Sequence, residues 1–273
     1  MTNPKSPVAA TPRMQLARPQ HEMTPAPSEP IHAGRSRPIR WLQLFGERCS
    51  GTNFVAQLLR RNAWRLSPTD RHGWKHGFVD EVRGPAEDTA FLLVVRDPFD
   101  WAQSLWRQPW HAAQSLRDAT FSDFARMEWR CEWGRDMEIA ADDPRVGSEM
   151  LHERDPATGR RFVDIFALRT AKLRAHLSLR DRVRQFSVAR YERVAADPRA
   201  FCREFCAEHG IARWPWFRPV RTFKGGADPF VIKPREPMRR DDVLHIASRL
   251  DAALERELGY DVDARLRELL TEA

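Results

Sequence analysis

The stretch "FGERCSGTNFVAQLLRR", from Phe45 to Arg61, joins the end of an apolar run to a short polar turn and an amphipathic segment. The apolar run 39–46 predicts a buried strand, and the apolar spacing after the turn predicts a helix over 52–64. A turn that opens a helix directs backbone N–H groups and the positive end of the helix dipole to one point, which suits an anion. The phosphate loop of ATP- and GTP-binding proteins has the pattern GxxxxGK[ST]. This turn has one interior glycine and no lysine, so we expect an anion-binding loop of another kind.

Strand-like and helix-like segments alternate along the rest of the chain. This alternation predicts an α/β fold with a central, mostly parallel sheet covered by helices on both faces, a three-layer α/β/α arrangement. Ligands of such sheets bind beyond the carboxyl ends of the strands, where several polar residues of this chain are expected. Further strands are expected at 73–78, 89–96 and 182–192, and helices after Asp97 and over 121–133, 162–179, 197–211, 240–258 and 261–271.

The first 38 residues differ in composition from the rest. They contain eight prolines and no aromatic residue, so they cannot bury enough apolar surface to offset the entropy of ordering them. We expect a disordered, proline-rich tail over 1–38 and one domain over 39–273. Residues 1–40 carry a net charge of +4 out of +7 for the whole chain. The remainder is less basic than a nucleic-acid-binding domain needs, so a modest positive pocket for an anionic ligand is the better expectation.

Cysteine usage and hydropathy limit the class of protein further. The four cysteines, Cys49, Cys131, Cys202 and Cys206, form no CxxC pair and have no histidine at metal-ligand spacing. We therefore expect buried thiols in a reducing compartment and no metal site. No apolar run approaches the roughly 18 residues that span a membrane, and no signal peptide is visible. A cytoplasmic protein without an integral membrane segment is expected, and its oligomeric state stays open.

Two segments carry side chains suited to a phosphorylated ligand. In the turn after Phe45, the hydroxyl groups of Ser50 and Thr52 add donors to the backbone amides, although an ordinary helix N-cap is an equally weighted reading. Arg96 ends a predicted strand and offers a bidentate fork to a phosphate. Ser104 follows eight residues later, about two turns into the next helix. The alternative for Arg96 and Ser104 is that they are an ordinary surface arginine and an ordinary serine on the face of a helix, without a ligand.

In this order, the segments resemble the sulfotransferases that use 3′-phosphoadenosine 5′-phosphosulfate (PAPS). In that family a strand–loop–helix with an [KR]-S-G-T-[TN] core holds the 5′-phosphosulfate, and a later R-[DN]-P-x-D-x-x-x-S pattern holds the 3′-phosphate. The resemblance covers about 39–260 and implies a P-loop-like sulfotransferase fold. It assigns the 5′-phosphosulfate to Arg48, Cys49, Ser50, Gly51, Thr52 and Asn53, and the 3′-phosphate to Arg96 and Ser104, in a pattern completed by Asp97, Pro98 and Asp100.

Two later segments extend the resemblance. The family has a Y-E-x-x-x-x-D-P segment, matched here from Tyr191 to Pro198, whose tyrosine lies near the adenine. The stretch "VRTFKGGADPF" at 220–230 looks like a weaker form of the R-K-G loop that closes on the 3′-phosphate. The resemblance therefore adds Tyr191, Lys224 and Gly225 to the expected cofactor-binding residues.

The chain departs from the family at the loop cation. The family places Lys or Arg directly before S-G-T to stabilise the leaving phosphate, whereas this chain has Cys49 there and Arg48 one position earlier. Arg48 and Lys75 are both candidates for that role. The histidine of "WKHG", His76, resembles the catalytic base of the family's K-x-H segment, and histidine titrates near neutrality. Glu47 is the second candidate for the base, a structural histidine is the alternative for His76, and Lys75 is also suited to stabilise the transferred sulfuryl group.

The sequence thus predicts a sulfotransferase that moves a sulfuryl group from PAPS to a hydroxyl or amine of an unidentified small-molecule or glycan acceptor by in-line attack, with His76, Lys75 and Arg48 as catalytic residues. Two alternatives stay open. A P-loop kinase-like phosphotransferase needs a loop lysine and a magnesium-binding acid, and neither is evident. A catalytically inactive nucleotide-binding module is favoured by Cys49 in place of the loop cation.

Overall fold

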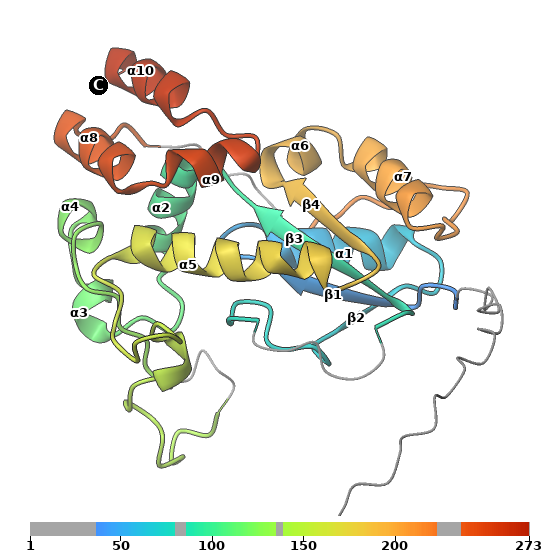
Figure 1. Cartoon of the computed structure of the whole chain (residues 1–273), viewed down its shortest axis with the longest axis horizontal. Helices are drawn as coiled ribbons and strands as arrows, with labels where there is room; N and C mark the ends of the chain where they lie inside the picture. The colour runs from blue at the N-terminus through green and yellow to red at the C-terminus, as the bar shows by residue number, and fades with distance from the viewer. Residues whose placement is uncertain (1–36, 80–85, 135–138, 223–235, 273) are drawn as a thin grey trace, which may run out of the picture. The chain divides into compact units, whose positions relative to one another are not determined.

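Four parallel strands form the centre of the fold (Figure 1). The computed structural model describes residues 37–79, 86–134, 139–222 and 236–272, so the tail expected at 1–38 lies outside it except for two residues. The strands are β1 (Trp41–Phe45), β2 (Ser67–Thr69), β3 (Thr89–Val95) and β4 (Phe186–Arg190).

The order of the strands across the sheet is β2-β1-β3-β4, and every pairing is parallel. β1 pairs with β2 on one side and with β3 on the other, in a register that sets Trp41 opposite Thr89. The chain therefore changes direction across the sheet between β1 and β3. In open α/β sheets, the crevice beyond the carboxyl ends of two such strands is where ligands bind.

Helices cover both faces of the sheet (Figure 1). One face packs Leu42, Leu44 and Leu92 against α1 and α7, and the opposite face packs Phe91 and Leu93 against α5. This confirms the predicted three-layer α/β arrangement. The helices are α1 (Thr52–Asn62), α2 (Pro98–Arg107), α3 (Gln114–Arg117), α4 (Phe121–Phe124), α5 (Ile165–Leu177), α6 (Tyr191–Ala196), α7 (Pro198–Glu208), α8 (Arg240–Arg249), α9 (Ala252–Glu257) and α10 (Val262–Glu272), with the short 3-10 turns η2 (Leu151–Glu153) and η3 (Ser178–Asp181).

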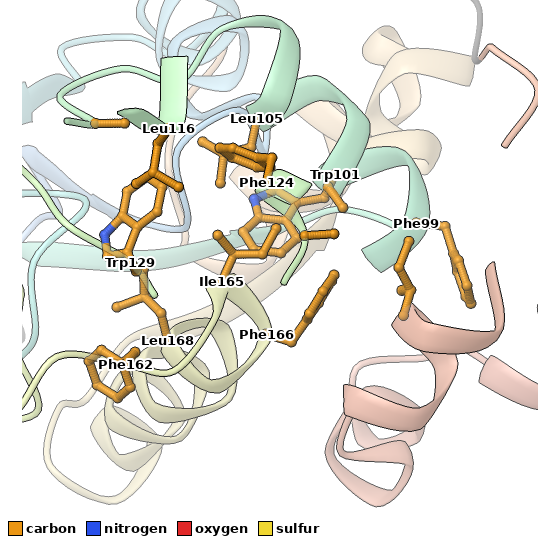
Figure 2. Close-up of a cluster of buried hydrophobic side chains, with 14 of the residues drawn as sticks. Phe99, Trp101, Leu105, Leu116, Phe124, Trp129, Phe162, Ile165, Phe166 and Leu168 are labelled. Carbon is orange, nitrogen blue, oxygen red and sulfur yellow. The ribbon is translucent and has the colours of Figure 1, made fainter. Parts of the chain in front are cut away.

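A third group of apolar side chains lies beside the sheet, between α2, α5 and α8 (Figure 2). Phe99 and Trp101 point into it from α2, and Ile165 and Phe166 point into it from α5. All four are fully buried. Burying side chains of this size stabilises each by roughly 1.5–3 kcal/mol relative to exposure. The packing fixes α2, and with it the residues that leave the carboxyl end of β3.

Four predicted elements differ from the structure. The helix expected over 240–258 is divided into α8 and α9, because Leu250 adopts an extended backbone conformation. The second strand is β2, and residues 73–78 form turns instead, because Gly77 N–H donates to the Trp74 carbonyl over 2.9 Å and closes a tight turn. The helix expected over 121–133 ends at Phe124, and Cys131 forms an isolated antiparallel bridge with Ala112. The strand expected to run to residue 192 ends at Arg190, where α6 begins. Within the described residues, no helix is long and apolar enough to cross a membrane.

Candidate functional site

The turn after β1 is held close to the neighbouring strand. A Cβ atom at Gly46 would lie 2.4 Å from the Val94 carbonyl oxygen of β3, so only glycine fits where β1 ends. The Ser50 amide and hydroxyl both donate to the Glu47 carbonyl, over 3.1 and 2.7 Å. The Ser50 hydroxyl is thus used by the turn itself, and it is buried. The turn is a rigid support for the start of α1.

Gly51 is the N-cap of α1 and lies against Tyr191. Its φ of 94° is in the left-handed region, and an added Cβ would come within 2.3 Å of the Tyr191 ring. A side chain at this position would be strained by both the backbone and the ring. The first amides of α1, from Gly51 to Asn53, precede any intrahelical acceptor, as at every helix N-terminus. Their dipoles give the loop a positive end suited to an anion.

Arg96 joins this loop to Tyr191. Its Nη1 donates to the Cys49 carbonyl over 3.2 Å, and its guanidinium carbon lies 4.9 Å from the centroid of the Tyr191 ring. Residues from three segments, at the carboxyl ends of β1, β3 and β4, therefore meet at one edge of the sheet. The sequence predicted this meeting, while the ligand roles of Cys49, Gly51, Arg96 and Tyr191 stay predictions.

The Arg96 side chain also has an unused donor. Its Nε atom is buried and has no hydrogen-bond partner among the described residues. Leaving a buried donor unsatisfied is costly, more so when the donor belongs to a charged group. A buried donor without an acceptor in a native structure indicates that a ligand supplies the acceptor. A phosphate oxygen is well suited, because a guanidinium group can form two parallel hydrogen bonds with a phosphate. A phosphorylated ligand therefore fits this group of residues.

The backbone around Arg96 is fixed from two sides. Arg169 of α5 donates to the Arg96 carbonyl over 2.9 Å, and its guanidinium forms a fully buried ion pair with Glu255. On the other side, the Asp97 amide donates to the Glu192 carboxylate over 2.8 Å. Asp97 then caps α2 by accepting hydrogen bonds from the next amides of the helix. Burial raises the pKa of Asp97 to about 6, with the Asp100 charge adding to the shift.

Hydrogen bonds hold His76 against the same loop. Gly46 N–H donates to the Lys75 carbonyl over 3.0 Å, and the Gly46 carbonyl lies 2.7 Å from Nδ1 of His76. Because a carbonyl can only accept, the neutral ring carries its proton on Nδ1 and its lone pair on Nε2. Burial, together with the charges of Arg48 and Lys75, lowers the pKa of His76 well below its usual value. The ring is therefore neutral at pH 7, as a general base must be.

Lys75 lies at the opening of α1. Its Nζ donates to Oδ1 of Asn53 over 2.6 Å, across 22 residues of sequence. Asn53 is exposed, while Thr52 beside it is buried. The ammonium group thus lies beside the first turn of the helix.

Arg48 is held in a buried ion pair. Its guanidinium donates to Glu153 of η2 over 2.9 Å and to Nδ1 of His111 over 3.1 Å. Lys172 of α5 donates to the same Glu153 over 2.9 Å and to the His76 carbonyl over 2.6 Å. Both cations and the carboxylate are at most 2% exposed. Contact between Arg48 and a ligand phosphate would have to replace these bonds.

The pKa values of the two buried carboxyl groups near the loop are shifted in opposite directions. Burial alone would raise the pKa of Glu153, but Arg48 and Lys172 lower it well below its usual value. For Glu47, burial is the dominant effect and raises the pKa. Oε1 of Glu47 is buried without a hydrogen-bond partner in the described part of the chain. Glu153 is thus held as an anion by its two cations, whereas burial raises the pKa of Glu47.

Aromatic rings surround the base candidate. Trp74 lies 5.4 Å from His76, 5.6 Å from His111 and 5.9 Å from His152, measured between ring centroids. The Arg48 guanidinium carbon lies 4.9 Å from the Trp74 centroid. Trp74 therefore places a large apolar ring beside His76.

The remaining predicted site residues are less connected. Ser104 lies half-buried in α2, and no hydrogen bond joins it to Arg96 in the described ranges. Lys224 and Gly225 lie outside the described residues. In the part of the chain that the structure describes, no group of three or more His, Cys, Asp or Glu side chains is arranged to hold a metal ion.

Sequence reasoning missed Glu153 and Lys172. Glu153 comes from a three-residue 3-10 turn that no local pattern marks. Lys172 could have been suspected, because Arg169, Lys172 and His176 follow one another at helical spacing on the face that Ile165 and Leu168 bury. Charged residues along an apolar stripe are rarely buried without partners.

Comparisons with known proteins give one structural likeness. No family model matches the chain, and no curated protein matches it. The structure is similar to the crystal structure of a sulfotransferase from Alicyclobacillus acidocaldarius, with a TM-score of 0.43 and 17% sequence identity. The match covers 85% of this chain and 100% of that one. A likeness at this level assigns no activity, so the function must be argued from the site.

Proposed function

We propose that the chain is a sulfotransferase that uses PAPS and sulfates a hydroxyl or amine of an acceptor. One observation carries the proposal: the Arg96 guanidinium, with a buried and unsatisfied Nε–H, lies between the Cys49 carbonyl of the loop and the Tyr191 ring. A nucleotide with one phosphate on the loop and another on Arg96 would satisfy both groups.

The binding roles follow from this arrangement. The amides of Gly51, Thr52 and Asn53 at the start of α1 would hold the 5′-phosphosulfate, supported by the turn through Ser50. Arg96 and Ser104 would hold the 3′-phosphate, and Tyr191 would lie near the adenine. Lys224 and Gly225 are proposed to add contacts to the 3′-phosphate from their loop.

His76 is proposed as the general base. Its Nδ1–H is committed to the Gly46 carbonyl, so Nε2 is the atom that would take the proton of the acceptor hydroxyl or amine. Bound PAPS supplies the sulfuryl group, whose sulfur bonds to the acceptor as its bond to the 5′-phosphate oxygen breaks. Lys172 holds the His76 backbone through the carbonyl, so the ring stays in place while it accepts the proton. Glu47, which is 2% exposed and whose pKa burial raises, is the second candidate for the base.

Lys75 is the better supported of the two candidate cations. Its Nζ lies at the first turn of α1, where the leaving phosphate would sit, and it donates to the neutral side chain of Asn53. Arg48, by contrast, is bonded to Glu153 and His111. We propose that Lys75 stabilises the charge that develops on the leaving phosphate and the sulfuryl group. Arg48 would act mainly by holding the loop in place through its bonds to Glu153 and His111.

A thermal shift experiment tests the nucleotide. The desulfated cofactor PAP should raise the melting temperature, and ATP with magnesium should not. Stabilisation by ATP with magnesium alone would refute the proposal in favour of a phosphotransferase. Stabilisation by PAP without any transfer from labelled PAPS to a panel of sugars, phenols and amines would instead indicate an inactive binding module.

The pH profile of transfer tests the base. Because the pKa of His76 is lowered, kcat/KM should stay constant as the pH falls through 6.5, the usual value for histidine, and decline only below it. His76→Ala should lower kcat by about 10²–10⁴-fold while PAP still raises the melting temperature. His245→Ala, a half-buried histidine bonded to the Ala125 carbonyl, is the matched control. Undiminished transfer by His76→Ala would remove this residue from the mechanism.

A further inference from the structure

A cluster of tryptophan and arginine side chains covers the other end of α1. We call it the Trp–Arg surface, and it is formed by residues 60–65 and 213–218. Of the ten tryptophans in the chain, only Trp64 and Trp216 are exposed, by 39% and 52%, and both belong to it. Its arginines, all exposed, are Arg60, Arg61, Arg65, Arg213 and Arg218.

The rings and guanidinium groups form one connected array. Trp64 meets Trp214 with 4.2 Å between ring centroids, and Trp214 stacks on Trp216 at 5.6 Å. The Arg218 guanidinium lies over both Trp214 and Trp216, and Arg65 lies over Trp64. The two segments are thus a single surface, although about 150 residues of sequence separate them.

Backbone hydrogen bonds hold the surface in place. Trp64 N–H donates to the Ala212 carbonyl over 2.7 Å, and Trp214 N–H donates to the Asn62 carbonyl over 3.1 Å. The buried Asn62 side chain donates to the Arg218 carbonyl and accepts from the Arg218 amide, over 2.9 and 2.7 Å. The array is therefore preorganised, and little entropy is lost when it binds a partner.

The charge of the surface has one sign. No acidic residue occurs in 60–65 or 210–218, and none of the five arginines forms an ion pair with another described residue. Arg60 and Arg61 complement the dipole of the last turn of α1, but this does not explain two exposed indoles beside them. A partner with dense negative charge and an apolar layer would match both features.

We propose that the Trp–Arg surface docks the protein onto an anionic phospholipid membrane. Indoles favour the headgroup region, and basic clusters bind anionic lipid headgroups electrostatically. Single-stranded nucleic acid fits less well, because it stacks bases on free ring faces. Here a guanidinium group or a neighbouring indole already lies against each of Trp64, Trp214 and Trp216.

Docking at this end would leave the candidate site accessible. α1 has 11 residues and is about 16 Å long, with the anion loop at its start and the Trp–Arg surface at its end. The membrane proposal does not depend on the proposed sulfotransferase activity.

Vesicle sedimentation with the full chain tests the proposal. The protein should bind vesicles of phosphatidylcholine mixed with phosphatidylserine, should bind phosphatidylcholine vesicles far more weakly, and should be released by high salt. Each arginine near an anionic membrane strengthens binding about fivefold, so Arg213→Gln with Arg218→Gln should weaken it about 25-fold. Trp216→Ala should weaken binding and reduce the blue shift of tryptophan fluorescence that insertion causes.

The control is Arg180→Gln with Arg193→Gln, which removes the same charge from exposed arginines on η3 and α6. It should bind as the wild type does. Circular dichroism confirms that each variant is folded. Equal binding to both kinds of vesicle, equal loss in the control, or tighter binding to a single-stranded oligonucleotide than to anionic vesicles would each overturn the proposal.

Discussion

An arginine lies over a tryptophan ring at each end of α1, but one arginine is buried and the other is exposed. At the start of the helix, the Arg48 guanidinium carbon lies 4.9 Å from the Trp74 ring centroid, and at its end Arg218 lies 5.3 Å from Trp214. Arg48 is 2% exposed and bonded to Glu153, whereas Arg218 is exposed and has no acidic partner among the described residues.

The difference follows from the cost of moving a charge out of water. A buried guanidinium needs a carboxylate and further hydrogen bonds, so Arg48 is fixed by Glu153 and His111 and its field is largely cancelled within the core. An exposed guanidinium is solvated, so its field extends outward to partners. The same residue pair therefore anchors a loop at one end of α1 and forms a binding surface at the other.

The largest expected effect comes from applying one substitution to both ends. Arg48→Met leaves Glu153 with Lys172 alone and should lower the free energy of unfolding by about 3–5 kcal/mol, because it breaks a buried ion pair by removing one partner. Arg218→Met should change it by less than about 0.5 kcal/mol, as for most surface substitutions. Urea unfolding of both variants measures the difference. Equal losses would show that burial does not distinguish the two arginines.

A glycine pair gives the next largest effect. Gly51→Ala at the start of α1 and Gly210→Ala beside its end both force a left-handed φ, 94° and 63°, on alanine. Each costs about 1–2 kcal/mol for that reason. Only Gly51→Ala also drives a methyl group into Tyr191, because nothing lies within 4 Å of a Cβ at Gly210. We expect an additional loss of about 1–3 kcal/mol from overpacking.

The two glycine variants should also differ in ligand binding. Gly51→Ala should abolish the thermal shift caused by PAP, while Gly210→Ala should keep it. If Gly210→Ala were as destabilising as Gly51→Ala, the contact with Tyr191 would contribute nothing.

A smaller effect is expected at Asn62, which ties the end of α1 to Arg218. Asn62→Ala removes three side-chain hydrogen bonds and should lower the free energy of unfolding by about 1–2 kcal/mol. It should also change the fluorescence of the tryptophans and weaken vesicle binding. Gln57→Ala, in the middle of the same helix, is the control. An Asn62→Ala protein with unchanged stability would contradict the view that hydrogen bonds preorganise the surface.

The smallest expected effect concerns pH. Burial lowers the pKa of His176 to about 4, so this histidine gains no proton in the folded chain between pH 6.5 and that value, while the unfolded chain does. The stability that it contributes is therefore present above pH 6.5 and lost as the pH falls towards 4. The loss should reach about 1 kcal/mol by one pH unit below 6.5.

His176→Gln tests this sign. Urea unfolding of the wild type and the variant at a series of pH values should show a shallower decline for His176→Gln below pH 6.5 and identical slopes between pH 7 and 8. A steeper decline in the free energy of unfolding for the variant than for the wild type would contradict a lowered pKa of His176.

Local sequence patterns predicted the parts of the site that follow strand ends. The loop after β1, Arg96 after β3 and Tyr191 after β4 each stand beside a hydrophobic run, and parallel strands bring such positions to one edge. The segment 73–78 was predicted wrongly as a strand, because a local turn closes at Gly77. Hydrogen bonds to Gly46, about 30 residues away, also hold it in place.

The partners of Arg48 and Arg218 could not be predicted for the same physical reason. Glu153 follows Arg48 by 105 residues, and Arg218 follows Asn62 by 156. Contacts at such separations depend on how the layers pack, which no short-range periodicity encodes. The sequence marked Arg48 as a candidate cation, but only the structure shows that Arg48 is buried and Arg218 is exposed.

The assignment of the two phosphate positions can be tested by calorimetric titration of two nucleotides into two proteins. PAP carries a 3′-phosphate and AMP does not, so the wild type should bind PAP about 10–100-fold more tightly through the charged hydrogen bonds of Arg96. Arg96→Met should lose that preference while its affinity for AMP stays close to that of the wild type. If Arg96→Met weakened both nucleotides equally, or kept the full preference for PAP, Arg96 would not hold the 3′-phosphate.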